Sequence, residues 1–255
     1  MPEPKQVLIY FEGDDDGAFL KPLLEANILP SFCKLAVRDK SKHAGKDGLV
    51  GQIIPFVSPV NGVDGKAIVL IDLDEQTVEQ QVEWFHQQLR KGISQHPQIA
   101  IQRTQVSERL TRITISADDR SGHVAIVSVG CPHEVEFNNR FGIDRFAIDD
   151  WVFRLTLDQV VYDEVSDFRN VPFEVASKKY QEVAALFRQN GLEVRKAKSY
   201  LQILRAVCGI RPSTATIIGN IVKKAIAKHG NDGLIDRLKP LIHDLQQAAD
   251  QLKEL

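Results

Sequence analysis

Two apolar runs that end in carboxylates constrain the fold of this chain most strongly. Residues 7–11 are followed by Glu12, and residues 67–71 are followed by Asp72. Short, continuous apolar runs bounded by glycine or charge are typical of parallel strands that are covered on both faces. The carboxyl ends of such strands form the ligand-binding edge of an open α/β sheet. We therefore expect the two acidic segments to meet at one edge of a sheet.

Acidic side chains gathered at one edge predict a bound cation. Crowded carboxylates repel one another by several kcal/mol unless a cation lies between them, and their oxygens suit Mg²⁺ or Mn²⁺. Asp72 and Asp74 are expected to coordinate the metal directly, because both can turn toward one ion at a strand end. Glu12 either completes the coordination or transfers a proton. Asp14 and Asp15 are expected to be solvated or to cap a helix, and Glu75 is expected in the first turn of the next helix.

The order of these motifs resembles the TOPRIM domain. An apolar run followed by Glu12-Gly13-x-x-Asp16, a helix with Phe19-Leu20 and Leu23-Leu24, and a second run ending in Asp72-x-Asp74 carry the resemblance. TOPRIM domains occur in topoisomerases, bacterial primases, a small ribosomal-RNA maturase and the overcoming-lysogenization-defect nucleases. The resemblance covers roughly the first half of the chain. It implies a site for Mg²⁺ or Mn²⁺ in which Asp16 is a candidate ligand of a second metal ion.

Two shorter segments extend the resemblance. Residues 148–153 resemble the acidic position that stand-alone TOPRIM-like proteins carry after the last core strand, which makes Asp149 a candidate metal ligand. The alternative is the start of a surface helix. Residues 195–201 resemble the lysine segment that follows, and in the overcoming-lysogenization-defect nucleases a lysine assists the transition state. Lys198 is preferred over Lys196 for that role, and a solvated basic helix face is the alternative.

The pattern of the whole chain predicts an α/β fold: a mainly parallel, TOPRIM-like (Rossmann-like) sheet flanked by helices, with a C-terminal helical region. Repeated strand–helix units favour parallel strands. We divide the chain into a metal-binding domain, residues 1–150, and a helical domain, residues 151–255. Further strands are expected at 32–37, 99–106, 112–116 and 124–129, with helices at 17–26, 47–57, 77–89, 175–187, 201–208, 217–226 and 238–252.

Helix ends and the C-terminal tail give more specific expectations. Ser213 is a plausible N-cap, and Gly230 is a plausible stop for the same helix. Apolar residues in the tail, from Leu238 to Leu252, recur at spacings of four and three. Packing within the molecule is favoured over a dimer seam, since two heptads fall short of a coiled coil. A homo-oligomer stays open.

The net charge of −2 hides an asymmetry: residues 169–255 carry +7 and residues 1–168 carry −9. A basic half suits a polyanion, and we expect nucleic acid as the partner, DNA before RNA. No Gly-x-x-x-x-Gly-Lys-Ser/Thr segment is present, so ATP hydrolysis by this chain is not expected. The basic residues proposed to contact phosphates are Arg38, Lys40, Lys42, Lys46, Arg195, Lys196, Lys198, Arg205, Arg211, Lys223, Lys224 and Lys228.

Other sequence features restrict the setting of the protein. Cys33, Cys131 and Cys208 are isolated, which indicates neither a disulfide framework nor a zinc site. No basic leader precedes a long apolar stretch, and no segment approaches the roughly 20 apolar residues that span a bilayer. A cytoplasmic location without membrane association is expected.

These features favour a metal-dependent nuclease that hydrolyses phosphodiester bonds in DNA or RNA, with Glu12 and Lys198 as catalytic residues. The chain is too short for a topoisomerase gate, and it lacks the zinc-binding segment of a primase. An alternative is an inactive TOPRIM-like module that binds nucleic acid or regulates a partner such as an ATPase. A phospho-acceptor receiver domain is a third, weaker interpretation. Similar stand-alone domains occur in phage defence.

Overall fold

A computed structural model describes residues 6–37, 45–59, 64–93, 98–165, 168 and 170–255. Its described part contains one six-stranded sheet with the strand order β2-β1-β3-β6-β5-β4. The expectation of an α/β fold is confirmed. The strands are β1 (Val7–Tyr10), β2 (Cys33–Leu35), β3 (Lys66–Asp72), β4 (Ala100–Gln105), β5 (Leu110–Ala117) and β6 (Arg120–Val129).

Four of the six strands, β2, β1, β3 and β6, run parallel. Their register places Tyr10 at the end of β1 beside Val69, and Asp72 at the end of β3 beside Val129. The chain therefore leaves β1 and β3 at the same edge, so that Glu12 and Asp72 emerge close to each other. The predicted meeting of the two acidic segments is a direct result of this register.

The remaining strands, β4 and β5, are antiparallel additions at the other side of β6. The predicted loop between the last two strands is shorter than expected, because Ala117 and Arg120 still pair with each other. Asp118 takes a left-handed conformation with φ of 51° in the turn, a conformation that Asp tolerates better than most residues. The hairpin is consequently tight.

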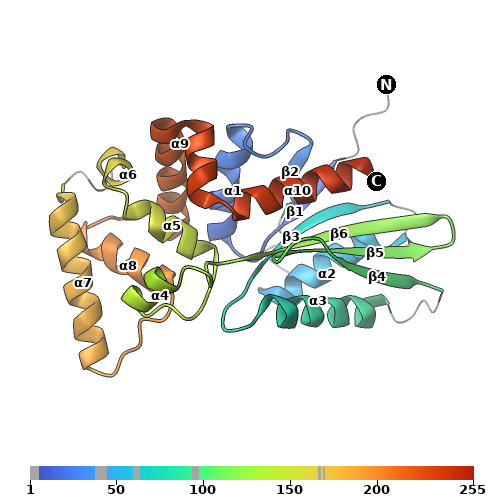
Figure 1. Cartoon of the computed structure of the whole chain (residues 1–255), viewed down its shortest axis with the longest axis horizontal. Coiled ribbons are helices and arrows are strands. Elements are labelled where there is room, and N and C mark those ends of the chain that lie inside the picture. The colour runs from blue at the N-terminus through green and yellow to red at the C-terminus, as the bar shows by residue number, and fades with distance from the viewer. Residues whose placement is uncertain (1–5, 38–44, 60–63, 94–97, 166–167, 169) are drawn as a thin grey trace.

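Helices cover both faces of the sheet (Figure 1). On one face, α2 (Lys46–Val57) and α3 (Val78–Ile93) pack over β3 and β6 through Ile53, Val82 and Phe85. On the other face, α10 (Leu241–Glu254) packs against β6, β3 and β1, and α1 (Asp14–Glu25) packs against β2. The nearly continuous burial of β3 follows from this double cover, as the apolar run of the sequence predicts.

The other helices gather beyond the carboxyl edge of the sheet, on the left of Figure 1. One hydrophobic cluster joins them to the sheet, and it extends from Val7 in β1 to Leu252 in α10. The predicted boundary near residue 150 lies within this shared core, and the division into two domains stays a prediction. These helices are α4 (Val135–Phe141), α5 (Ile148–Thr156), α6 (Gln159–Glu164), α7 (Phe173–Gln189), α8 (Ala197–Val207) and α9 (Thr214–Leu238).

Helix ends agree with the sequence in part. The Ser213 side chain accepts a hydrogen bond from the backbone N–H of Thr216, which confirms it as the N-cap of α9. Gly230 has φ of 68° and breaks the helical path, but a second helical segment follows at once and continues to Leu238. The first helix begins at Asp14, three residues before the predicted start, because acidic residues suit the first turn of a helix.

Two further features can be compared with the sequence analysis: the state of the cysteines, and the length and apolar character of the helices. Cys33, Cys131 and Cys208 are free and buried, as expected. Among the described residues, none of the helices has both the length and the apolar character that crossing a bilayer requires.

Candidate metal centre

Two helices begin at the carboxyl edge of the sheet, and each starts with acidic residues. In the first turn of α1, Asp16 Oδ2 accepts a hydrogen bond from the N–H of Gly13 at 2.8 Å. In the first turn of α5, Asp150 Oδ2 accepts one from the N–H of Ala147 at 3.2 Å and one from the N–H of Cys131 at 3.0 Å. Both aspartates thus cap their own helices, and the positive ends of two helix dipoles point to this edge.

Backbone donors also position the carboxylates at the strand ends. Glu12 Oε1 accepts a hydrogen bond from the N–H of Asp72 at 3.2 Å, which ties the end of β1 to the end of β3. Asp72 Oδ1 accepts one from the N–H of Ile148 at 3.2 Å, at the start of α5. Three segments far apart in the sequence are therefore held together through two carboxylates.

The strand-end and helix-start carboxylates of Glu12, Asp16 and Asp72 line one cavity of about 390 Å³, which we call the carboxylate cavity. The predicted site residues Glu12, Asp16, Asp72, Asp149 and Lys198 all line it. The structure thus brings together five of the six predicted site residues, from β1, α1, β3, α5 and α8. The full lining is Glu12, Gly13, Asp14, Asp15, Asp16, Gly45, Asp72, Asp149 and Lys198.

The acidic side chains of the carboxylate cavity ionise less readily than free carboxylic acids. Burial raises the pKa of Glu12 and of Asp149 to about 7 each, against an opposing effect of nearby lysines. Burial also raises the pKa of Asp16 to about 6. Asp72 is affected most: loss of hydration, together with the charges of Asp16, Glu12 and Asp149, raises its pKa well above the ordinary value. Such shifts are typical of sites whose charge is balanced by a bound group.

Asp149 shows the clearest sign of a missing partner. The residue is 6% exposed, and its Oδ1 atom is buried without a hydrogen-bond partner among the described residues. A buried, unpaired carboxylate oxygen is costly, and a cation would satisfy it. Within the described ranges, however, no group of three or more His, Cys, Asp or Glu side chains is arranged to hold a metal ion as it stands. The donor set suits Mg²⁺ or Mn²⁺ in its chemistry.

Lys198 reaches the cavity from the first turn of α8. Its Nζ donates a hydrogen bond to Asp15 Oδ2 at 2.5 Å. Burial alone would lower the pKa of Lys198, but the bond to Asp15 and the charges of Asp149 and Asp16 raise it, so that the ammonium is charged. The expectation that Asp15 is merely solvated or capping is not met, since it holds the lysine at the cavity.

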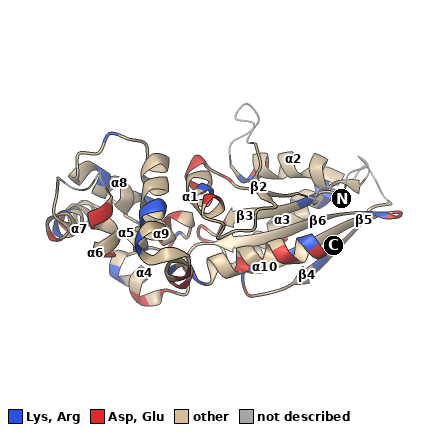
Figure 2. Cartoon of the chain, turned by 90° about the horizontal axis from the view of Figure 1, so that it is seen from above, with Lys and Arg blue, Asp and Glu red and all other residues tan. Residues whose placement is uncertain are grey.

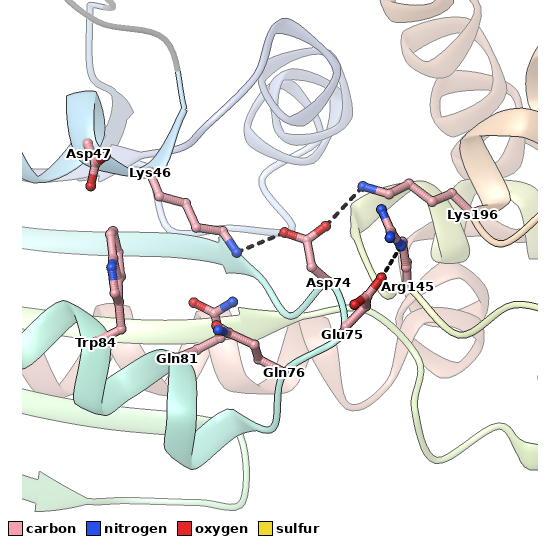
Figure 3. A pocket seen from close by; sticks show the side chains of 9 residues that line it. All are labelled: Lys46, Asp47, Asp74, Glu75, Gln76, Gln81, Trp84, Arg145 and Lys196. Atoms are coloured by element: carbon pink, nitrogen blue, oxygen red, sulfur yellow. Dashed lines mark hydrogen bonds and ion pairs between the residues drawn. The ribbon is translucent and has the colours of Figure 1, made fainter.

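Asp74 does not line the carboxylate cavity. It has φ of 51°, and its backbone pairs with Phe146, so the chain turns away from the strand direction directly after Leu73. Its two carboxylate oxygens bind Lys46 at 2.9 Å and Lys196 at 3.0 Å (Figure 3). Burial would raise the pKa of Asp74, but the hydrogen bonds from the two lysines outweigh it and lower the pKa. The simple alternation of a strand could not predict this left-handed turn.

Asp74 instead lines a second cavity of about 580 Å³, which we call the Trp84 cavity (Figure 3). Lys46 separates the two cavities: its Nζ donates to the backbone oxygen of Asp72 at 2.9 Å and to Asp74. Glu75, expected in the first turn of a helix, lies before α3 and forms ion pairs with Arg145 and Arg195. The lining residues are Lys46, Asp47, Asp74, Glu75, Gln76, Gln81, Trp84, Arg145 and Lys196.

The predicted basic residues that the structure describes are spread over several elements. Basic and acidic residues are interspersed over the helices in Figure 2, and several lysines pair with acids elsewhere in the chain. Lys223 binds Glu25, and Lys228 binds Glu164. Arg38, Lys40 and Lys42 lie outside the described residues. Lys46 and Lys196 line the Trp84 cavity and both bind Asp74, whereas Lys198 lines the carboxylate cavity.

Sequence reasoning missed the main supports of the site. Asp150, which the sequence pattern does not single out, caps α5 and thereby fixes the N–H of Ile148 that donates to Asp72. The acidic pair before an amphipathic run was a usable signal, because acids at the third helical position commonly cap the helix. The role of Lys46 carried no such signal, since it depends on the packing of α2 beside β3.

Comparisons with known proteins define the fold alone. No protein-family model matches the chain, and no curated protein matches its sequence. A crystal structure of a hypothetical protein from Pyrococcus horikoshii OT3 is similar over 97% of this chain and 99% of that chain, with a TM-score of 0.53 and 15% identity. The shared arrangement therefore includes both the sheet and the C-terminal helices.

Proposed function

We propose that the protein is a divalent-metal-dependent nuclease of the TOPRIM type, which hydrolyses phosphodiester bonds in nucleic acid. The observation that carries the proposal is the convergence of Glu12, Asp16, Asp72 and Asp149 on one cavity, with Lys198 beside them. The ionised forms of these acids destabilise the folded protein, because loss of hydration raises the pKa values of Glu12, Asp72 and Asp149.

Glu12, Asp72 and Asp149 would hold Mg²⁺ or Mn²⁺, with Asp16 as a further ligand. The metal would polarise a phosphoryl oxygen and lower the pKa of a bound water. Glu12 is also suited to accept a proton, since its pKa of about 7 lies near neutral pH. Lys198 is held by Asp15 where its ammonium group can stabilise negative charge that develops on the phosphate.

A cytoplasmic nucleic acid, DNA before RNA, is the proposed substrate, and phage defence is one setting in which such a nuclease would act. The positive ends of α1 and α5 favour an anionic group at this edge. Lys46, Lys196 and Lys198 at the cavity mouths supply further positive charge for the phosphate backbone.

Incubation of supercoiled plasmid with Mg²⁺ or Mn²⁺ tests the proposal. We expect nicked or linear product from the wild-type protein, and none from a protein that carries Asp72→Asn and Asp149→Asn. Asp163→Asn is a matched control, because Asp163 is an exposed acid on α6. Equal cleavage by all three proteins would contradict the proposal. Nucleic-acid binding without metal uptake or cleavage would instead support an inactive module that partners an ATPase.

A further inference from the structure

The Trp84 cavity lies directly beside the carboxylate cavity and contains groups that the proposed chemistry does not use. Residues from α2, α3, the end of β3 and the segment before α8 form it (Figure 3). Lys46 lies between the two cavities, since its ammonium group binds both the backbone of Asp72 and the carboxylate of Asp74. A strand that occupied both cavities would pass Lys46.

Gln81 provides a buried acceptor that lacks a partner. The residue is 1% exposed, and its Nε2 donates to the backbone oxygen of Leu73 at 3.2 Å, which fixes the orientation of the amide. Its Oε1 is buried without a hydrogen-bond partner among the described residues. Because buried acceptors are normally satisfied, an N–H or O–H group of a bound molecule is the fitting complement.

Two lysines provide positive charge on either side of Asp74. An ammonium group has three N–H donors. Within the described part of the chain, Lys196 Nζ donates to Asp74, and Lys46 Nζ donates to Asp72 and Asp74. Both groups retain donors for an additional acceptor, and an anionic phosphate oxygen is suited to accept from them beside Asp74.

Trp84 provides an aromatic surface in the same cavity. It lies on α3, one turn after Gln81, and its side chain is only partly buried. In Figure 3 its ring lies below Asp47 and to the left of the Lys46 ammonium group. Bases of single-stranded nucleic acid stack on such rings, and the stacking tolerates any sequence because every base has a π-face.

We propose that the Trp84 cavity binds one unpaired nucleotide of the substrate strand. The base stacks on Trp84, an N–H of the base donates to Gln81 Oε1, and the phosphate accepts from N–H donors of Lys46 and Lys196 that face the cavity, beside Asp74. This inference rests on the proposed nuclease function and adds that the substrate is single-stranded next to the cleaved bond. A base within a duplex is excluded, because its stacking faces and pairing hydrogens are already occupied.

Fluorescence anisotropy with a labelled single-stranded oligodeoxynucleotide tests the inference. The measurement uses the full chain in the presence of a chelator, so that binding is observed without cleavage. We expect Trp84→Leu to weaken binding about tenfold, within the range of one base–aromatic stack, and Trp84→Phe to retain most of the affinity. Phe187→Leu is the matched control, because Phe187 is a 38% exposed aromatic residue that lines a different cavity. Circular dichroism confirms that each variant is folded.

Three further ligands separate the possible occupants. An oligonucleotide with abasic positions should bind the wild-type protein as weakly as the intact strand binds Trp84→Leu. A duplex should bind independently of Trp84. Equal affinity for free adenosine monophosphate and for the strand would assign the cavity to a free nucleotide and overturn the inference.

The outcome is distinguishable from that of the plasmid assay. Metal-dependent cleavage with binding that ignores Trp84 and base content would overturn this inference and leave the nuclease proposal intact. Trp84-dependent binding of single strands without any cleavage would reject the nuclease proposal and retain the nucleotide site.

Discussion

The N–H of Ile148 donates a hydrogen bond to Asp72 Oδ1 at 3.2 Å, across 76 positions of the sequence. This bond connects the end of β3 to the first residue of α5. It orients the Asp72 carboxylate toward the same cavity that Asp149 enters from the next position of the helix. The geometry of the candidate site thus depends on where α5 begins.

The positions of Asp72 and Asp74 predict opposite effects on metal binding. Asp72→Asn should abolish the uptake of Mn²⁺ measured by isothermal titration calorimetry, because Asp72 lines the carboxylate cavity. Asp74→Asn should retain it within about threefold, since Asp74 is bound to Lys46 and Lys196 in the other cavity. An equal loss in both variants would show that Asp74 is a ligand after all.

The raised pKa values predict an unusual dependence of stability on pH. Glu12 and Asp149 have pKa values of about 7 in the folded protein, above the ordinary values of 4.5 and 3.8. Between the ordinary pKa values and pH 7, the folded chain holds protons that the unfolded chain has lost. The free energy of unfolding is therefore highest at low pH, where both acids are protonated, and it falls as the pH rises through about 7. The shifts correspond to about 3 kcal/mol for Glu12 and about 4 kcal/mol for Asp149 in the free energy of unfolding.

Thermal unfolding in chelator from pH 5.5 to pH 8.5 measures this dependence. Asp149→Asn should raise the melting temperature at pH 8.5 and leave it nearly unchanged at pH 5.5. The exposed Asp163→Asn should change neither. Mn²⁺ should stabilise the wild-type protein more at pH 8.5 than at pH 5.5. A destabilised Asp149→Asn protein at pH 8.5 would argue against a buried, unfavourable charge.

Lys198 is expected to assist cleavage without holding the metal. Lys198→Met should lower the rate of plasmid cleavage about a hundredfold, the typical cost of removing one group that stabilises transition-state charge. Mn²⁺ affinity should stay within a few-fold of the wild-type value. The control is Lys178→Met, since Lys178 is a 77% exposed lysine on α7. Unchanged cleavage by Lys198→Met would transfer the role to another cation.

Gly130 supports the site through the backbone. It has φ of 111°, and an added Cβ would lie 2.5 Å from the Cβ of Phe146 and 3.0 Å from the N atom of Ala147. Gly130→Ala should therefore lower the free energy of unfolding by about 3 kcal/mol and weaken metal binding, because the start of α5 must move.

Gly191→Ala measures the cost of alanine at a positive φ without the steric clash that Gly130→Ala introduces. Gly191 has φ of 75°, but nothing lies within 4 Å of an added Cβ. We expect a cost of about 1 kcal/mol, measured by denaturant titration, and an unaltered affinity for Mn²⁺. If both alanine variants were equally stable, the close approach of β6 to the start of α5 would be unimportant.

The sequence predicts the sheet well, because β3 and β6 are buried on both faces and strands of that kind have continuous apolar runs. It also predicts the convergence of Glu12 and Asp72, which follows from parallel strands alone. The short helices α4, α5 and α6 carry few apolar repeats and were not predicted from periodicity. The separation of Asp74 from Asp72 depends on a left-handed turn and two distant lysines, neither of which is visible in an Asp-x-Asp pattern.

Ion pairs within the molecule involve the charge asymmetry of the chain, which composition alone could not show. Basic residues of the second half bind acids of the first, as Lys223 binds Glu25 and Lys198 binds Asp15. The surplus of positive charge in residues 169–255 is therefore partly neutralised within the molecule. Among the described residues, Lys46, Lys196 and Lys198 line the two cavities, where the proposed nucleic-acid backbone would meet them.

The position of α10 has a consequence for synthesis. Residues 241–254 cover the face of the sheet formed by β1, β3 and β6, and Leu241, Leu245 and Leu252 of this helix are fully buried. On the ribosome, the strands emerge long before α10, which covers them. A nascent chain halted before residue 241 would expose the apolar side chains that α10 covers in the complete fold. Such an incomplete chain would need a chaperone to keep it from aggregating.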